Sequence, residues 1–172
     1  TAFMDSVDVR EGTSTGISAA DRAATVRALL DEESGAQDFI KPGHVFPLKS
    51  AKGGVLERKG HTEGTVDLAR ICGLKPAGVI CEILNNDGSM MRLEGLRNFA
   101  TIHNLKMTSV SEIVKYRQQN EKLISFEREI NMPTKSGKFR LRLYKSQIDQ
   151  NDHVVLVCRE KMQEKIPLVR VH

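Results

Sequence analysis

Hydrophobic and polar positions follow two different periods along this chain of 172 residues. Over residues 12–123, stretches with the 3.6-residue spacing of amphipathic helices alternate with short apolar runs typical of buried strands. After about residue 124 the period falls to two, since Phe139, Leu141 and Leu143 alternate with basic or aromatic residues. We therefore predict an α/β (α+β) fold, a three-layer core with a mixed sheet followed by a partial antiparallel β segment.

Capping signals place four helices in the first part of the chain. Ser18 and Asp21 form a capping-box pattern ahead of the first helix. Gly73 suits the position just beyond the C-terminus of the second, and Ser109 precedes the fourth. The predicted helices span residues 18–30, 62–73, 96–103 and 110–121.

Apolar runs between the helices predict strands, and polar clusters predict the turns. A turn is expected at residues 85–88, Asn-Asn-Asp-Gly, and another at residues 135–137, Lys-Ser-Gly. The predicted strands, besides the alternating one around residues 139–144, span residues 77–84, 90–93, 105–108, 153–158 and 168–171. The last of these stops in mid-strand and the chain opens without Met, so we expect it to be part of a larger protein.

Composition excludes several classes of protein. Apolar residues make up 40% and charged residues 28% of the chain, which excludes a disordered chain and a coiled coil. No apolar run approaches the roughly 18–20 residues of a membrane span, and no signal peptide is visible. The net charge of +4 is too weak to indicate nucleic acid by itself. The three cysteines, without C-x-x-C spacing, favour a reducing cytoplasm.

Two glycine-containing loops could bind an anion. The stretch from Gly12 to Gly16 precedes the first predicted helix, and such loops are also common without any ligand. The second loop holds Arg58, Lys59, Gly60, His61 and Thr62 at the start of the next predicted helix. Guanidinium, hydroxyl and helix N–H groups together make a phosphate cradle. The alternative is a solvated basic turn.

Two further residues could carry acid–base chemistry. His44 lies between two prolines in Pro-Gly-His-Val-Phe-Pro, a stiff extended segment, although a lone histidine is often structural. Glu82 falls in the middle of the predicted strand 77–84, whose two faces are otherwise apolar. A buried carboxylate must be paired or must hold a proton, which favours a functional role.

A basic stripe runs along the predicted strand near the C-terminus. Its residues are usually the solvated face of an amphipathic strand, with binding of nucleic acid or nucleotide phosphates as the alternative. The stripe comprises Lys135, Lys138, Arg140, Arg142 and Lys145.

Taken in order, these motifs resemble those of 3,4-dihydroxy-2-butanone 4-phosphate synthase. The resemblance covers about residues 1–119. The stretch from about residue 125 resembles the start of GTP cyclohydrolase II, the order found in bifunctional riboflavin-biosynthesis enzymes. The motifs that carry the resemblance are residues 6–22, 42–48, 53–56, 60–63, 67–70, 76–82, 134–140 and 167–172.

The resemblance implies a function for each candidate. The family converts D-ribulose 5-phosphate to 3,4-dihydroxy-2-butanone 4-phosphate and formate with Mg²⁺ or Mn²⁺, as a homodimer. It implies a synthase domain over residues 1–123 and the start of a cyclohydrolase-like domain over residues 124–172. Its essential histidine and glutamate fall on His44 and Glu82, and Glu82 also contacts substrate. Its metal histidine falls on His61. The sugar-phosphate stretch falls on Arg58, Lys59, Gly60, His61 and Thr62.

The family's R-E-x-E-G-D segment, which supplies metal carboxylates, is absent from the 172 residues, and the cyclohydrolase portion stops before its cysteine zinc ligands. We therefore expect the parent enzyme to be active and this chain alone to be inactive. No nucleic acid or membrane partner is expected. The alternative is a non-catalytic phosphate- or RNA-binding α/β module.

Overall fold

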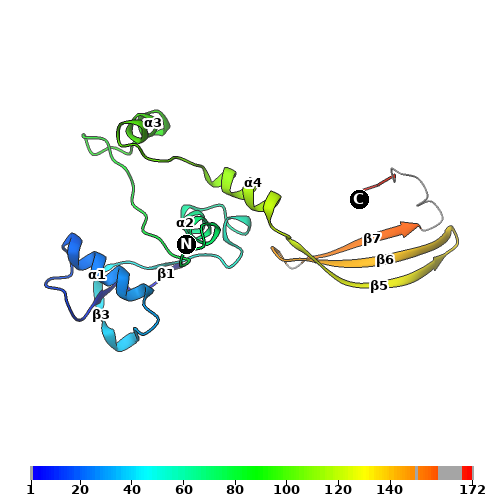
Figure 1. The fold of residues 1–172 in the computed structure, drawn as a ribbon, viewed down its shortest axis with the longest axis horizontal. Coiled ribbons are helices and arrows are strands. Elements are labelled where there is room, and N and C mark those ends of the chain that lie inside the picture. Colours follow the sequence, from blue (N-terminus) through cyan, green and yellow to red (C-terminus); the bar gives the residue numbers. More distant parts are fainter. Residues whose placement is uncertain (1, 150, 159–167, 172) are drawn as a thin grey trace. The chain divides into compact units, whose positions relative to one another are not determined.

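The computed structural model describes residues 2–149, 151–158 and 168–171. The chain divides into two compact units, residues 1–116 and residues 117–172 (Figure 1). The first unit combines helices with short antiparallel strand pairs, and the second is an antiparallel sheet. The mixed α/β class is therefore confirmed.

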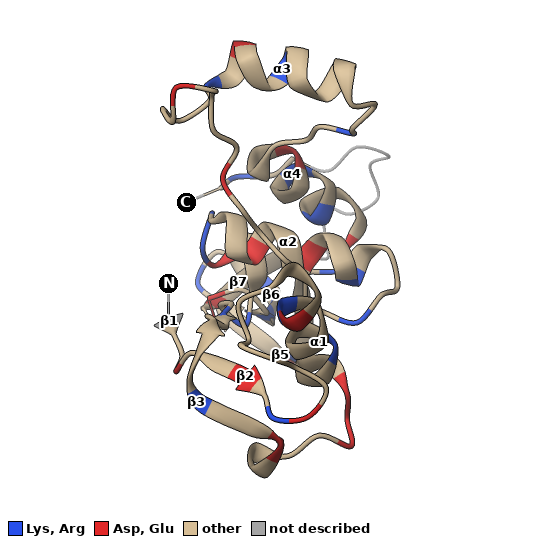
Figure 2. Cartoon of the chain, turned by 90° about the vertical axis from the view of Figure 1, so that its left-hand side faces the viewer, with Lys and Arg blue, Asp and Glu red and all other residues tan. Residues whose placement is uncertain are grey.

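Two pairs of strands in the first unit bring the N-terminal residues against residues 39–49. Strand β1 (Ala2–Phe3) pairs with β4 (Leu48–Lys49), and β2 (Val7–Val9) pairs with β3 (Phe39–Val45). The register of β2 on β3 is irregular between its first two residues. Figure 2 shows an acidic position on β2 and a basic one on β3. Their pairing places the loop after β2 beside the histidine segment.

The helices of the first unit agree with the capping signals. The Ser18 hydroxyl accepts a hydrogen bond from the Asp21 N–H at 3.0 Å, and Gly73 has a φ of +69°. The Ser109 hydroxyl accepts one from the Glu112 N–H at 3.2 Å. All four predicted helices are confirmed, with shifted ends: α1 (Ala19–Leu30), α2 (His61–Ile71), α3 (Leu93–Ile102) and α4 (Val110–Asn120). Two short 3₁₀ turns, η1 (Ala36–Asp38) and η2 (Gly54–Leu56), complete the unit.

The predicted strands 77–84 and 105–108 are wrong for the described residues. Residues 77–83 have no regular structure, and Leu84 makes one isolated bridge with Met90. The turn at 85–88 between them is confirmed, with the Gly88 N–H donating to the Asn85 carbonyl at 2.9 Å. The predicted strand 90–93 is reduced to that bridge, because α3 begins at Leu93. An interior strand needs neighbours on both edges, and without them the described residues do not form a three-layer core with a mixed sheet.

The second unit is a three-stranded meander. Strand β5 (Ile124–Thr134) pairs with β6 (Gly137–Ser146), which pairs with β7 (Asp152–Cys158). The turn at residues 135–136 and the alternating strand around 139–144 are confirmed, as is the predicted strand 153–158. Residues 168–171 form no strand in the structure. The prediction of a strand at residues 168–171 is therefore wrong.

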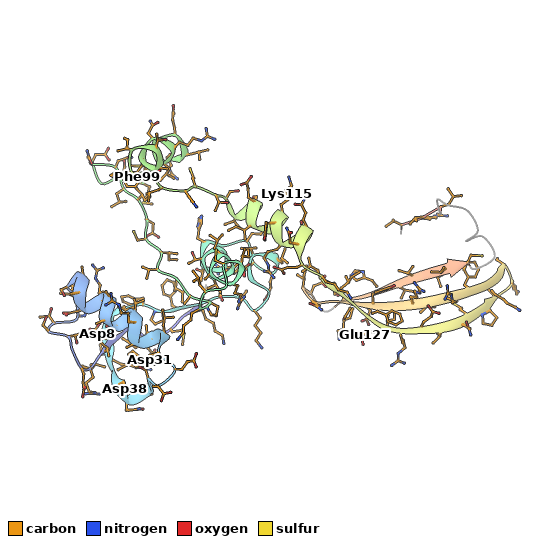
Figure 3. All side chains as sticks on the ribbon, in the orientation of Figure 1. Asp8, Asp31, Asp38, Phe99, Lys115 and Glu127 are labelled. Carbon is orange, nitrogen blue, oxygen red and sulfur yellow. The ribbon has the colours of Figure 1, made fainter. Side chains whose placement is uncertain are left out.

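Buried positions near the loops are mostly polar. The buried apolar residues are Val7, Val55, Ala69 and Ile113, whereas the buried polar ones are Asp8, Asp21, Thr25, Glu63, Asp67 and Ser146. Other apolar side chains pack locally, as Phe99 does against His103 with ring centroids 4.3 Å apart (Figure 3). A buried carboxylate is stable only when N–H groups satisfy it. The buried carboxylates therefore mark where backbone loops are fixed.

Candidate functional site

His44 is held near the end of β3 by a close approach to β2. The Gly43 N–H donates to the Ser6 carbonyl at 3.1 Å and to the Ser6 hydroxyl at 3.2 Å. A Cβ atom at Gly43 would overlap the Val7 backbone, so only glycine allows this approach. The imidazole that follows is therefore fixed against β2 while 42% of its side chain remains exposed.

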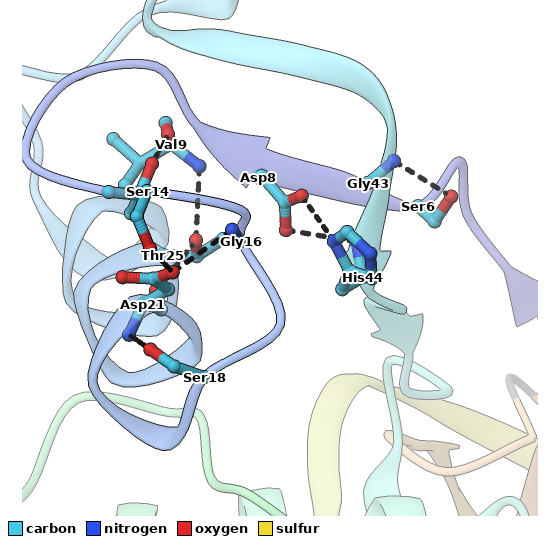
Figure 4. Close-up of polar contacts among 11 residues, drawn as sticks. Ser6, Asp8, Val9, Ser14, Gly16, Ser18, Asp21, Thr25, Gly43 and His44 are labelled. Carbon is cyan, nitrogen blue, oxygen red and sulfur yellow. Dashed lines mark hydrogen bonds and ion pairs between the residues drawn. The ribbon is translucent and has the colours of Figure 1, made fainter.

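Asp8 on β2 accepts two hydrogen bonds from His44. Its Oδ1 accepts the His44 backbone N–H at 2.9 Å, and its Oδ2 lies 2.7 Å from His44 Nδ1 (Figure 4). The backbone hydrogen bond from His44 is the largest influence on Asp8 and lowers the pKa of this carboxyl. Burial opposes that effect, and the hydrogen bond to the imidazole adds to it. Asp8 is thus a carboxylate at neutral pH and orients the imidazole.

The glycine loop between β2 and α1 encloses this pair. Gly16 has a φ of +83°, and a Cβ there would lie 2.8 Å from His44 Nδ1 and would overlap Asp8. The buried Asp21 carboxylate fixes the loop by accepting the Gly16 N–H at 3.0 Å and the Ser14 hydroxyl at 2.9 Å (Figure 4). Gly16 of the predicted Gly12–Gly16 loop therefore lies against the Asp8–His44 pair, and the positive φ of both glycines explains them without a phosphate.

The basic loop before α2 is built around a third buried carboxylate. Glu63 is fully buried and accepts the Ala51 N–H at 3.1 Å and Arg58 Nη1 at 3.1 and 3.3 Å. Burial raises the pKa of Glu63, but the Ala51 N–H and the Arg58 guanidinium outweigh it, so the pKa lies below its ordinary value. Arg58, predicted as a phosphate ligand, is thus ion-paired with Glu63.

The rest of the predicted cradle lies at the start of α2. Gly60 precedes the helix, and no side chain caps it by a hydrogen bond. The His61 side chain is exposed in the first turn, next to Thr62, and Lys59 lies in the loop before it. Asp67, a buried carboxylate further along α2, accepts the Val55 N–H at 2.8 Å and thereby fixes η2. The first backbone N–H groups of α2 have no backbone acceptor within the helix, as at any helix N-terminus.

A cleft of about 970 Å³ brings part of the predicted site together. His44 and Thr62 both line it, with Arg22 from α1 and apolar side chains of α1, β3 and residues 76–80. Glu82 is not among the lining residues. It is exposed in the irregular segment after residue 76, so the prediction that it sits in an interior strand is wrong.

No group of three His, Cys, Asp or Glu side chains suited to a metal is found among the described residues. His61 is therefore a single imidazole, and a hard cation such as Mg²⁺ takes most of its affinity from oxygen ligands. The residues present do not by themselves make the metal site that the resemblance implies. Cys72, Cys81 and Cys158 are free thiols. No described helix is long and apolar enough to cross a membrane.

The basic stripe is partly neutralised. Glu129 on β5 lies opposite Arg142, with Arg142 Nε at 2.6 Å and Arg140 Nη1 at 3.2 Å from its carboxylate oxygens. Side-chain hydrogen bonding from Arg142 is the main cause that lowers the pKa of Glu129. Two of the five basic side chains thus serve a cross-strand ion pair, which weakens the case for nucleic-acid binding.

Two carboxylates of the site were not predicted from the sequence: Asp8, which fixes His44, and Glu63, which pairs with Arg58. A signal for Asp8 was present, because it lies between Val7 and Val9 in a short apolar strand. A carboxylate among apolar strand residues was also the reason for selecting Glu82, so Asp8 could have been selected on the same ground. Glu63 carries no such signal, since a glutamate in the first helical turn is ordinarily a solvated partner of the helix dipole.

Two known protein families match this chain. Residues 1–116 match the family 3,4-dihydroxy-2-butanone 4-phosphate synthase, and residues 125–172 match GTP cyclohydrolase II. The chain is 48% identical over all of its 172 residues to the riboflavin biosynthesis protein RibBA of Salinispora arenicola. It spans 41% of that relative's length.

Solved structures of the same family agree with the fold. RibBX from A. baumannii, a two-domain 3,4-dihydroxy-2-butanone 4-phosphate synthase, superposes with a TM-score of 0.79 at 41% identity, covering 90% of this chain and 46% of that one. A synthase solved in complex with two magnesium ions has a TM-score of 0.62 at 33% identity, covering 70% of this chain and 61% of the other. The chain therefore belongs to the 3,4-dihydroxy-2-butanone 4-phosphate synthase family, and a partial GTP cyclohydrolase II region follows its synthase part.

Proposed function

We propose that the protein of which this chain is a part converts D-ribulose 5-phosphate to 3,4-dihydroxy-2-butanone 4-phosphate and formate, a step of riboflavin biosynthesis. The observation that carries the proposal is the Asp8–His44 pair at a cleft that Thr62 also lines. The reaction moves protons to and from carbon and oxygen of a sugar phosphate, which requires an oriented base beside an anion-binding helix terminus.

Each predicted residue has a role in this proposal. His44 takes and returns protons at Nε2, the ring nitrogen that Asp8 does not engage. Glu82 is the second acid–base group and a substrate contact, and this role needs the segment around residue 82 to close over the substrate. The sugar phosphate is bound at the start of α2 by the stretch Arg58, Lys59, Gly60, His61 and Thr62.

The proposed reaction also uses Mg²⁺ or Mn²⁺, with His61 as a ligand. When bound, the cation would stabilise negative charge on the oxygens of the sugar during enolisation. Since the described residues offer no cluster of three ligands, we expect this chain alone to bind the cation weakly.

The finer organisation is proposed on the same basis. We assign residues 1–123 to the synthase domain and residues 124–172 to the start of a cyclohydrolase-like domain. The three-layer core with a mixed sheet would form once residues 77–84 gain strand neighbours. The protein is expected to be a homodimer in the cytoplasm, with no nucleic acid or membrane as partner.

Formate release tests the proposal. Ribulose 5-phosphate and Mg²⁺ are supplied to this chain and to a version extended upstream by the family's R-E-x-E-G-D segment. We expect formate from the extended version and none from the chain alone.

In the active form, Glu82→Gln should abolish formate release and leave the fold intact, because the side chain is exposed. Glu33→Gln, another exposed carboxylate, is the matched control and should be active. The proposed function would be wrong if the extended version released no formate, and the role of Glu82 would be wrong if its variant matched the control.

A further inference from the structure

The two oxygens of Asp8 both accept N–H groups of one residue, and this arrangement decides where the His44 imidazole carries its proton. Oδ1 accepts the backbone N–H at 2.9 Å, and Oδ2 lies 2.7 Å from Nδ1. A carboxylate is an acceptor only, so Nδ1 must be the donor. In the neutral ring the proton then sits on Nδ1, and Nε2 holds the lone pair.

We propose that Asp8 is a positioning residue that fixes His44 in the Nδ1–H tautomer, so that Nε2 is the atom that exchanges protons with the substrate. The proposal rests on the proposed function for the identity of the substrate. Serine proteases fix their histidine with a buried aspartate in the same way. Here the aspartate also fixes the histidine's backbone, because its Oδ1 accepts the His44 backbone N–H.

The surroundings hold Asp8 in place for this role. Asp8 is 8% exposed, and the backbone N–H of its neighbour Val9 is bound by the fully buried Thr25 hydroxyl at 3.0 Å. Gly16 lies against both members of the pair, as its absent Cβ would meet each of them. The imidazole is therefore confined on the Nδ1 side, while 42% of the His44 side chain remains exposed.

The Asp8→Asn variant tests this proposal, because a side-chain amide has an oxygen that accepts hydrogen bonds and a nitrogen that donates them. The His44 backbone N–H has a fixed proton and needs the carbonyl oxygen, whereas the imidazole can exchange tautomer. The amide nitrogen of Asp8→Asn therefore faces Nδ1 and donates to it. The ring proton moves to Nε2, and the lone pair that should accept the substrate proton is lost.

The test reads the tautomer directly in the 172-residue chain labelled with ¹⁵N-histidine. Spectra are recorded near pH 9, well above the ordinary pKa of a histidine. His44→Gln assigns the His44 signals among the five histidines. We expect the proton on Nδ1 in the unmodified chain and on Nε2 in Asp8→Asn. Asp5→Asn removes an equal charge three residues away, from a carboxylate bound to Lys41, and should keep the Nδ1–H form.

Steady-state kinetics provide the second measurement, made on the form of the protein that releases formate. Asp8→Asn should lower kcat by about 100-fold or more, the usual contribution of a general base, with KM nearly unchanged. Glu33→Gln, at an exposed carboxylate that does not line the cleft, should behave as the parent.

An Nε2–H ring in the unmodified chain, or an unchanged tautomer in a folded Asp8→Asn, would overturn the proposal. Absence of formate from every form would instead contradict the proposed function, while the tautomer result would stand.

Discussion

At the scale of single residues, the structure depends on carboxylates that are buried and satisfied by backbone N–H groups. Asp8, Asp21, Glu63 and Asp67 each accept at least one backbone N–H across a loop or between strands. Hydrogen bonds to charged groups contribute about 1.5–3 kcal/mol each, roughly twice a neutral one. One acidic side chain can therefore hold a short loop in a single conformation.

Glu63 gives the clearest stability prediction. Its folded pKa is below its ordinary value of 4.5, so its contribution is fully present above that pH and is lost as the pH falls through the folded pKa. Glu63→Gln should lower the free energy of unfolding at pH 7 by about 1.5–3 kcal/mol, because the amide has no charge to pair with Arg58 and places an NH₂ group where Oε2 accepts from Arg58 Nη1.

Urea denaturation at pH 7 and at pH 3.5 checks this, with the exposed Glu33→Gln as control. The difference between Glu63→Gln and the unmodified chain should shrink at the lower pH, because below 4.5 the unfolded chain takes up a proton that the folded carboxylate resists. An equal difference at both pH values would mean that the charge of Glu63 contributes nothing.

At the scale of elements, α1 fixes the strand that carries Asp8. The Thr25 hydroxyl lies in the middle of α1, is fully buried, accepts the Val9 N–H and donates to the Asp21 carbonyl at 3.1 Å. Helix and strand are thus joined by a polar contact where the unit buries little apolar surface. The position of Asp8, and with it that of His44, therefore depends on the Thr25 hydroxyl.

Thr25→Val keeps the shape of the side chain and removes that hydroxyl. The partly buried Val9 N–H then lacks its acceptor, at a cost of about 1–3 kcal/mol in the free energy of unfolding. Urea denaturation measures the loss, and faster amide exchange at Val9 locates it. Thr101→Val is the matched control, since the exposed Thr101 hydroxyl donates only to Arg97 of its own helix at 3.0 Å. Equal stabilities of the two variants would contradict the role of Thr25.

The helices of this chain were predictable from sequence, and the strands only partly. Helices are local, and Ser18, Gly73 and Ser109 mark their ends by side-chain or backbone chemistry within a few residues. Strand β6 was predictable because its partners are sequence neighbours joined by short turns. Residues 77–84 have the composition of an interior strand, but composition cannot supply the neighbours that such a strand needs.

The same distinction applies to the site. His44 and Thr62 belong to recognisable motifs, and the structure places both at one cleft. The Asp8–His44 contact joins residues 36 positions apart, and the ion pair of Glu63 with Arg58 depends on how the loop folds back over α2. Such contacts follow from tertiary structure, so spacing along the chain did not reveal them.

At the scale of the whole molecule, exposed apolar side chains favour association. In the segment 77–84, Val79 is 73% exposed, Leu84 52% and Ile80 44%. Exposed apolar side chains in one segment are candidates for contact with another protein surface. This observation and the family resemblance both support the proposed homodimer.

Sedimentation velocity tests the dimer. We expect a reversible species of twice the 19.2-kDa chain at high concentration, dissociating on dilution. Val79→Lys should shift the equilibrium toward monomer, because a lysine ammonium is costly to bury in an apolar interface. Ile102→Lys is the control, since Ile102 is 77% exposed at the end of α3, outside this segment. A folded monomer at high concentration would contradict the dimer, and equal shifts in both variants would place the interface elsewhere.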